Sequence, residues 1–405
     1  MEKEGHVVET WKRNLYICWV GCFFTAVGMS LVIPFLPLYI MQLGENHNVE
    51  VWSSLAFCST FITAAIFSPI WGKLADKHGR KSMLIRASIG MATVMILIGF
   101  VQNVYQLVGL RLLMGAVSGF IPAATILVAS QTPTEESGRA LGVLSTGGVA
   151  GMLIGPVIGG LLADLIGLRQ VFWITGIMLF ITFSICLFVK EIKKPTLSAQ
   201  DSASNKPLNK KAFLALTGGI FVTTFLLQAA IMSIQPFLTL YVGELAKDTS
   251  YIAFLAGMVT AVSGISNMMA APFLGKLSDR IGPQKVLIAC LVVVGILLVL
   301  HAITMYVWQL ILLRFLLGFG LGGLLPAINT YLKKIIPDSL TGKAFGYNQT
   351  AQYMGNVAGP LLSGLIASRF GIPVVFIISG ILLIINAVWV IFFPKKMMQE
   401  KENVA

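Results

Sequence analysis

Two arginines lie inside long apolar stretches of the sequence, where a charged side chain is costly. Arg111 and Arg314 each stand about six residues from one end of such a stretch, roughly 9 Å deep at 1.5 Å per helical residue. Charged side chains inside a membrane usually face the protein interior and have a function. A long arginine side chain can also reach the lipid headgroups, so both interpretations stay open at this point.

Acidic residues are missing from the centres of these stretches. All 17 Asp and Glu residues lie at or beyond the stretch ends, and the nearest to a span interior are Asp164, Glu45, Glu244 and Asp76. His301 titrates near neutral pH when its environment is ordinary, although a lone histidine is more often structural. The interiors of these stretches therefore contain two arginines but no central carboxylate that could carry a proton.

The apolar stretches predict an integral membrane protein. The chain has 405 residues, of which 56% are hydrophobic and 11% are charged, whereas soluble domains carry about 25% charged residues. A helical span needs roughly 20 apolar residues, and helices satisfy their own backbone groups in lipid. We expect twelve transmembrane helices, at 15–42, 52–73, 82–103, 105–130, 139–166, 169–189, 213–243, 251–275, 285–304, 307–332, 342–369 and 372–393.

The placement of lysine and arginine predicts the orientation, because cytoplasmic loops carry an excess of both. The loops on one side hold only Arg169, Lys247 and Arg369. The basic loops on the other side are the N-terminus, 73–86, 139, 190–211, 276–285, 333–343 and the C-terminus. We therefore expect a multi-pass protein of the cell membrane with both termini in the cytoplasm. The net charge of +12 is explained by these loops, and we expect no nucleic-acid partner.

An internal repeat divides the chain into two halves of six helices each. Four patterns return in the same order and at nearly constant spacing: Pro34–Tyr39 at Pro236–Tyr241, Gly72–Asp76 at Gly275–Asp279, Arg111 with Gly115 at Arg314 with Gly318, and Gly155-Pro156 at Gly359-Pro360. An even number of spans per half makes this a parallel repeat. The expected organisation is a tail at 1–14, halves at 15–189 and 213–393, a linker at 190–212 and a tail at 394–405.

These motifs resemble those of the major facilitator superfamily, over essentially the whole chain. Residues 72–81 are similar to the family's loop 2–3 signature, and Arg111 with Gly115 and Gly119 is similar to the fourth-helix signature. Residues 147–160 resemble the fifth-helix signature of the drug:proton antiporter branches. The resemblance implies an all-α, twelve-span transporter of the bacterial multidrug efflux type. It also implies that Arg111 helps to couple proton movement to conformational change, and Asp164 is our candidate for a partner in that coupling.

The fifth predicted helix carries glycines on one face. Gly151, Gly155 and Gly159 are four residues apart, which lets another helix approach closely, and Pro156 can bend the helix. Ordinary helix packing explains this pattern as well as a functional role does. The resemblance implies a tight contact between the two halves that limits leakage.

Loop 2–3 contains the pattern Gly72, Asp76, Gly79 and Arg80. A carboxylate at this place can sit near the positive N-terminus of a helix, and the resemblance implies the helix beginning near Gly342 as its partner. Such a contact would exist in one transport state and would bias the populations of the states. The alternative is a basic loop that only sets the topology.

The substrate site is predicted from the resemblance, which implies a cavity lined mainly by helices 1, 4, 7 and 10. Each polar residue there can instead form a hydrogen bond between helices. Together with many Met and Phe side chains they would suit lipophilic substrates. The candidates are Tyr39, Gln228, Gln235, Asn329, Asn348, Gln352 and Tyr353.

Covalent chemistry has no support in the sequence. There is no phosphate-binding loop, no cluster of metal ligands, and the five cysteines all lie in apolar stretches, so we expect no cofactor and no metal. The leading hypothesis is a secondary active transporter that exports lipophilic drugs in exchange for protons, as a monomer in the bilayer. The alternatives are a transporter of one defined solute, such as a sugar, a small phosphorylated compound or a lysolipid, and a non-transporting membrane receptor.

Overall fold

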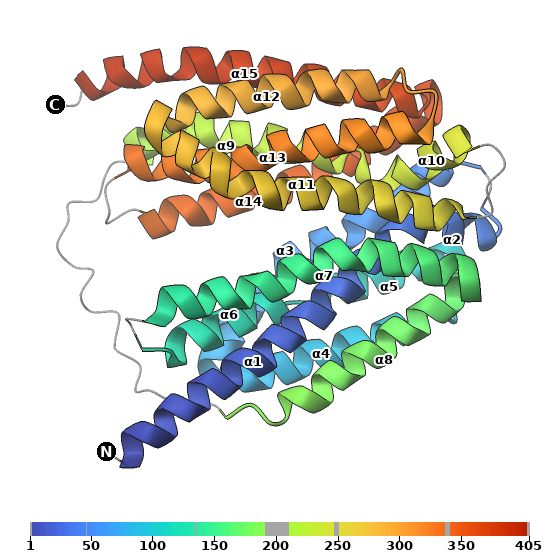
Figure 1. Ribbon diagram of the computed structural model, residues 1–405, viewed down its shortest axis with the longest axis vertical. Coiled ribbons are helices and arrows are strands. Elements are labelled where there is room, and N and C mark those ends of the chain that lie inside the picture. Colours follow the sequence, from blue (N-terminus) through green and yellow to red (C-terminus); the bar gives the residue numbers. More distant parts are fainter. Residues whose placement is uncertain are drawn as a thin grey trace. The chain divides into compact units, whose positions relative to one another are not determined.

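The computed structural model describes residues 2–45, 47–133, 136–190, 210–246, 251–336 and 341–402, and every element that it contains in these ranges is helical (Figure 1). The chain divides into two compact units. The first unit covers Met1–Thr196 and Lys247–Ala261, and the second covers Leu197–Ala246 and Val262–Ala405. The prediction of an all-α protein built from two repeated halves is confirmed.

The first unit is a bundle in which α1 packs along α7, α3 packs along α5, and α4 packs along α8. Figure 1 shows these elements from blue to green. Its elements are α1 (Glu2–Leu31), η1 (Ile33–Phe35), α2 (Leu36–Gln42), α3 (Val49–His78), α4 (Arg80–Ile98), α5 (Val104–Val117), α6 (Phe120–Gln131), α7 (Ser137–Ile166) and α8 (Leu168–Cys186).

The second unit repeats this arrangement, with α9 along α14 and α12 along both α13 and α15. Its helix α11 begins within the residues assigned to the first unit and ends in the second. The elements are α9 (Lys210–Met232), η3 (Gln235–Phe237), α10 (Leu238–Ala246), α11 (Ile252–Ile281), α12 (Pro283–His301), α13 (Val307–Ile335), α14 (Thr341–Phe370) and α15 (Ile372–Glu402).

Eleven segments of the described chain are long and apolar enough to cross a membrane. The segment predicted at 342–369 is α14, which has the required length of 30 residues but is more polar. Its polar residues include Asn348, Gln349, Gln352 and Asn356. A helix of membrane length that keeps several amides is the kind of element that lines a polar path or bonds to its neighbours.

Proline breaks the first helix of each unit at the same place in the repeat. Pro34 lies in η1 and Pro236 lies in η3, and each short 3-10 turn separates a long helix from a short one. Proline lacks the N–H that a continuing helix needs, so one predicted span becomes two helices and a turn. The first and last helices of the chain also extend beyond the predicted spans, since α1 begins at Glu2 and α15 ends at Glu402. Most of the linker predicted at 190–212, namely residues 191–209, lies outside the described residues.

A tyrosine hydrogen bond fastens this broken first helix in each unit. The hydroxyl of Tyr39 donates to the carbonyl oxygen of Ile98 at 2.8 Å, and the hydroxyl of Tyr241 donates to the carbonyl oxygen of His301 at 2.7 Å. Both carbonyls are at the end of the third membrane helix of their unit. The internal repeat is therefore visible in the hydrogen bonds as well as in the sequence.

Candidate functional site: gating, coupling and substrate residues

Loop 2–3 is a sharp turn between α3 and α4. Gly79 has a φ of 89°, a conformation that favours glycine, and its N–H donates to the carbonyl oxygen of Ala75. The guanidinium of Arg80 donates to the carbonyl oxygen of Ile126 on α6 at 2.9 Å. Gly72 has open space around its Cα. Of the predicted gating residues, the side chain of Asp76 lies outside the described residues.

The second basic residue of the turn, Lys81, fixes another helix end. Its ammonium group donates to the carbonyl oxygen of Leu187, just past the end of α8, at 2.8 Å. Arg80 and Lys81 thus hold the turn to two different helices.

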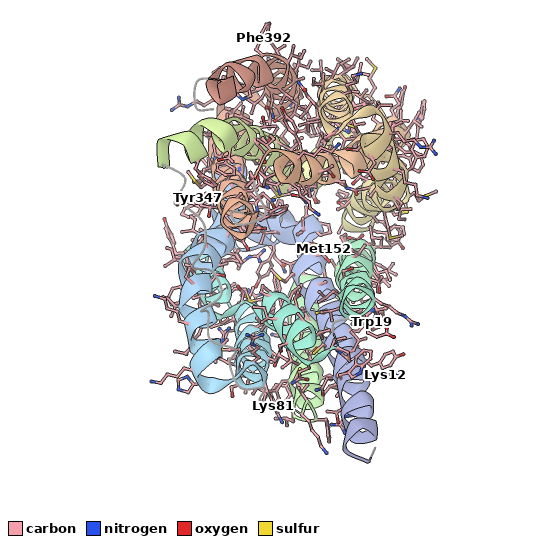
Figure 2. All side chains as sticks on the ribbon, turned by 90° about the vertical axis from the view of Figure 1, so that its left-hand side faces the viewer. Lys12, Trp19, Lys81, Met152, Tyr347 and Phe392 are labelled. Atoms are coloured by element: carbon pink, nitrogen blue, oxygen red, sulfur yellow. The ribbon has the colours of Figure 1, made fainter. Side chains whose placement is uncertain are left out.

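The glycine stripe of α7 packs on α1, within the first unit (Figure 1). A methyl group added to Gly151 would lie 2.5 Å from the carbonyl oxygen of Phe23, and one on Gly155 or Gly159 would also overlap α1. The hydroxyl of Ser30 donates to the carbonyl oxygen of Gly151 at 3.2 Å, which becomes possible because the backbones approach closely. This stripe therefore serves packing inside one unit. Figure 2 shows Trp19 and Met152 on these two neighbouring helices.

The same stripe recurs in the second unit. Gly355 and Gly359 of α14 contact the backbone of α9 at Phe225 and Ala229. The two glycine pairs occupy equivalent positions in the repeat, so the close contact between the first and fifth helices is a shared feature of both units.

A different face of α7 contacts the start of α11, also within the first unit. Gly160 lies against the backbone of Ala253, and Gly257 lies against the carbonyl of Pro156. The carboxylate of Asp164 accepts the N–H of Phe254 at 2.9 Å, in the first turn of α11. A carboxylate is favourable at a helix N-terminus, so Asp164 caps a helix other than its own. The structure thus gives Asp164 a defined contact that the sequence did not predict.

The two arginines inside the spans are buried. Arg111 has 6% of its surface exposed in the first unit and Arg314 has 4% in the second, so neither extends to lipid headgroups. The Nε atoms of both lack a hydrogen-bond partner in the described part of the chain, as does Nη2 of Arg314. A buried guanidinium with free donors is costly unless water or a ligand joins it in one state. This burial favours the functional interpretation.

His301 is also fully buried in the second unit. Its Nδ1 lies 2.6 Å from the carbonyl oxygen of Leu297, while its Nε2 has no partner among the described residues. The ring packs on Phe376 with the centroids 5.5 Å apart. A ring held by its own helix and by an aromatic neighbour fits the structural interpretation.

The predicted substrate residues divide into buried and accessible ones. Tyr39 is fully buried and bonds to Ile98 as described above, and Asn348 is buried and accepts the hydroxyl of Thr224 at 2.7 Å. Both side chains are committed to helix packing. The side chains that keep accessible surface are Gln228, Gln235, Asn329, Gln352 and Tyr353.

An aromatic cluster near the start of α9 and α14 was not predicted from the sequence. Tyr347, half of whose surface is exposed, has its ring centroid 6.0 Å from that of Phe221 and 5.9 Å from that of Phe213. Figure 2 marks Tyr347 on α14. Aromatic residues are common throughout the apolar stretches, so the sequence does not distinguish these three from the others. The packing of α9 on α14 brings them together.

Arg86 is the second residue that sequence reasoning missed. The charge pattern assigns it to the basic loop 73–86, whereas the structure places it in the second turn of α4. Its guanidinium donates to the carbonyl oxygens of Val117 and Ser118, between α5 and α6. Among the described residues, no three His, Cys, Asp or Glu side chains lie close enough to hold a metal ion.

Two repeated units of long apolar helices, each with a buried arginine, define a multi-pass membrane transporter. The family profile described as Major Facilitator Superfamily matches residues 18–256 and 220–404. The chain belongs to this superfamily, and the two overlapping matches cover both repeats.

Two relatives of high similarity carry the same name. The chain is 48% identical over 387 residues to the multidrug resistance protein MdtG of Salmonella typhimurium, covering 94% of this chain and 95% of that protein. It is 46% identical over 382 residues to the protein of the same name from Enterobacter lignolyticus, covering 94% of this chain and 91% of that protein.

Solved structures share the fold at low identity. A bacterial homologue of the human lysosomal transporter Spinster, in an inward-facing and unoccupied conformation, matches with a TM-score of 0.80 and 14% identity, over 96% of this chain and 98% of that chain. The nucleoside transporter NupG matches with a TM-score of 0.78 and 14% identity, over 95% of this chain and 99% of that chain. These two likenesses concern the fold alone.

Proposed function

We propose that this protein exports lipophilic drugs or toxic compounds across the cell membrane by proton antiport with alternating access. The observation that carries the proposal is the full-length similarity to multidrug resistance proteins named MdtG, at 48% identity over 94% of the chain. The polar helix α14 supports it, because a membrane helix with accessible amides suits a substrate path. Both termini face the cytoplasm, and the protein works as a monomer without enzymatic activity.

The gating role belongs to loop 2–3. Gly72 and Asp76 lie near the end of α3, Gly79 makes the turn, and Arg80 begins α4 and bonds to α6. A change at the turn therefore acts directly on α6. Asp76 makes its contact in one transport state only. Asp76→Asn is expected to slow transport at normal expression, and a wild-type rate would reduce the loop to a topology signal.

The α7 glycines and Pro156 keep the helices around the transport path closely packed. Gly151, Gly155 and Gly159 bring α7 against α1, and Pro156 meets Gly257 of α11. Close backbone contact excludes water, which limits leakage of protons and ions. The role proposed for this motif is therefore a seal that is built from packing.

Proton coupling uses Asp164 and Arg111. The carboxylate of Asp164 joins α7 to α11, and protonation removes the charge with which it accepts the N–H of Phe254. Arg111 is a buried cation with an unpaired Nε, so its interactions change with the state of the surrounding helices. Proton binding at Asp164 thereby releases the first turn of α11, while Arg111 responds to the rearrangement.

Substrates contact the accessible side chains of α9, η3, α13 and α14. Gln228, Gln235, Asn329, Gln352 and Tyr353 supply a few polar contacts. The cluster of Phe213, Phe221 and Tyr347 supplies an aromatic surface for lipophilic compounds. A site with few fixed polar groups accepts compounds of different structure, which is what multidrug export requires.

The test is dye accumulation in cells that lack other pumps. Expression should lower the accumulation of chemically different lipophilic dyes, such as Nile red and Hoechst 33342, and a protonophore should abolish the effect. If a broad panel accumulates unchanged while one defined solute is moved, the protein is a transporter of that solute. If neither moves although the protein is folded in the membrane, a receptor role replaces transport.

A further inference from the structure

The fourth membrane segment of the first unit is broken in its middle. α5 ends at Val117, Ser118 is extended, and α6 begins at Phe120. Gly119 has a φ of 118°, a left-handed conformation that costs other residues energy. The corresponding segment of the second unit, α13, runs unbroken over Val307–Ile335. The break is therefore a property of one unit and not of the repeat.

A break inside a membrane leaves carbonyl groups at the helix end that need donors. Just past the end of α5, the N–H and the hydroxyl of Ser118 both donate to the carbonyl oxygen of Gly115, at 3.3 and 2.7 Å. The indole N–H of Trp71 on α3 donates to the carbonyl oxygen of Ala116 at 2.6 Å. These two carbonyls are satisfied by the break itself and by the neighbouring helix.

Arg86 supplies the donors for the remaining two carbonyls. One terminal nitrogen of its guanidinium lies 2.9 Å from the carbonyl oxygen of Val117, and the other lies 3.0 Å from that of Ser118. The guanidinium carbon of Arg86 lies 3.8 Å from the centre of the Trp71 ring. The two side chains that donate to the carbonyls of the break therefore also stack on each other. The planar fork of arginine suits two adjacent acceptors, which the single ammonium of lysine does not.

The second unit provides an internal comparison. The offset that carries Gly115 onto Gly318 also carries Arg86 onto Ala289 and Trp71 onto Leu274. The unit that has the arginine and the tryptophan has the break, and the unit that lacks both has a continuous helix. A cation in a membrane helix is costly, so the presence of Arg86 at this point indicates that the break has a function.

The two pieces of the segment pack on different helices. Both touch α4, but α5 packs mainly on α3, whereas α6 packs on α1 and α7. Two hydroxyl groups of α3 bind backbone carbonyls of α5. The hydroxyl of Thr60 donates to the carbonyl oxygen of Arg111 at 3.1 Å, and that of Thr63 donates to the carbonyl oxygen of Leu112 at 2.7 Å. The buried Arg111 thus belongs to the piece that is fastened to α3.

We propose that the break at Ser118–Gly119 is a hinge, and that Arg86, stacked on Trp71, is the positioning residue that holds it. The hinge lets α5, with Arg111, move together with α3 while α6 stays with α1 and α7. The inference rests on the proposed transport cycle, in which Arg111 responds to proton binding. Arg86 does not touch substrate; it keeps the carbonyls of the hinge satisfied in each position.

The experiment measures the hinge directly in the purified full-length protein. Spin labels at Tyr105 on α5 and Ala129 on α6, both exposed, report the length of the segment, about 36 Å if it were one straight helix at 1.5 Å per residue. In the wild type the label distance should shift by several ångströms, on the order of one helical turn, between pH 5.5 and pH 8 or on adding tetraphenylphosphonium. In Arg86→Ala the distribution should no longer respond. An unchanging wild-type distance, or a wild-type response in Arg86→Ala, overturns the proposal.

Transport kinetics distinguish a positioning role of Arg86 from a general effect of its substitution on folding. Arg86→Lys and Arg86→Ala should each lower turnover roughly tenfold or more while KM stays near the wild-type value. Arg169→Ala is the matched control, because Arg169 also donates to a carbonyl oxygen, that of Val101, but outside any break. Its turnover should stay normal, and equal losses in all three variants would contradict a special role for Arg86. If no substrate is moved by the wild type, the proposed function fails, while the label distances still decide the hinge.

Discussion

The carboxylate of Asp164, near the end of α7, accepts the backbone N–H of Phe254 in the first turn of α11, at 2.9 Å. This bond joins the helix that carries the glycine stripe to the one helix whose residues are divided between the two units. The contact places a titratable group of one membrane helix at the N-terminus of another.

Asp164→Asn should uncouple proton movement from transport. The amide oxygen of asparagine can still accept the N–H of Phe254, so the fold should persist, but the side chain no longer binds or releases a proton. We expect proton-driven transport to fall roughly tenfold or more, with substrate exchange at equal pH on both sides largely kept. Transport assays in liposomes with and without a pH gradient measure both. A variant that keeps the wild-type response to the gradient would exclude Asp164 as the coupling residue.

The contact between α7 and α1 should not tolerate a side chain at Gly155. Valine at this position would overlap Ser30 and the backbone of α1, and overpacking of this kind costs about 1–3 kcal/mol. Gly155→Val should therefore lower the melting temperature and the transport rate. Gly148→Val is the control on the same helix, because nothing lies within 4 Å of a methyl group there. Equal melting temperatures in the two variants would contradict the packing that we describe.

Asn348 and Gln352 should respond to mutation in different ways, although both are amides of α14. Thr224→Val removes the donor to the buried Asn348 and leaves an unpaired acceptor, which costs about 1–3 kcal/mol of stability. Gln352→Ala removes a partly accessible amide and should change the relative rates for different substrates at unchanged stability. Thermal unfolding combined with a substrate panel distinguishes the two. A selective change in substrate range for Thr224→Val at normal stability would indicate that Asn348 contacts substrate after all.

Arg111→Ala should impair transport more than Arg314→Ala does. Both guanidinium groups are buried, but Arg111 lies on the helix piece that α3 holds and that ends at the break. Transport rates are compared after correction for the amount of folded protein, since either substitution alters a buried site. Equal losses would show that the two repeats contribute alike to coupling.

Much of the fold was predictable because it depends on composition and repetition. The apolar stretches predict the spans, and Pro34 and Pro236 recur at the place where each first helix breaks. The break after Val117 was not predictable, since its reason is a contact between Arg86 on one helix and carbonyls of another. Periodicity shows which residues share a face of α7, but not that α1 occupies this face.

The candidate site was predicted in part, for a similar physical reason. An amide or hydroxyl in a span indicates that it needs a partner, and the sequence does not say whether the partner is a helix or a substrate. Tyr39 and Ile98 are far apart in sequence, so their hydrogen bond could not be inferred from either residue. The sequence places Asp164 at a span end, whereas its bond to Phe254 depends on the fold.

Proton flux in liposomes tests coupled export most directly. The purified protein is reconstituted with a pH-sensitive dye inside, and tetraphenylphosphonium, which carries no exchangeable proton, is added outside. Substrate entering through an antiporter must drive protons out, so the internal pH should rise in wild-type liposomes and stay constant in protein-free and Asp164→Asn liposomes. Uptake of the probe by the wild-type protein with no change of internal pH would contradict proton antiport.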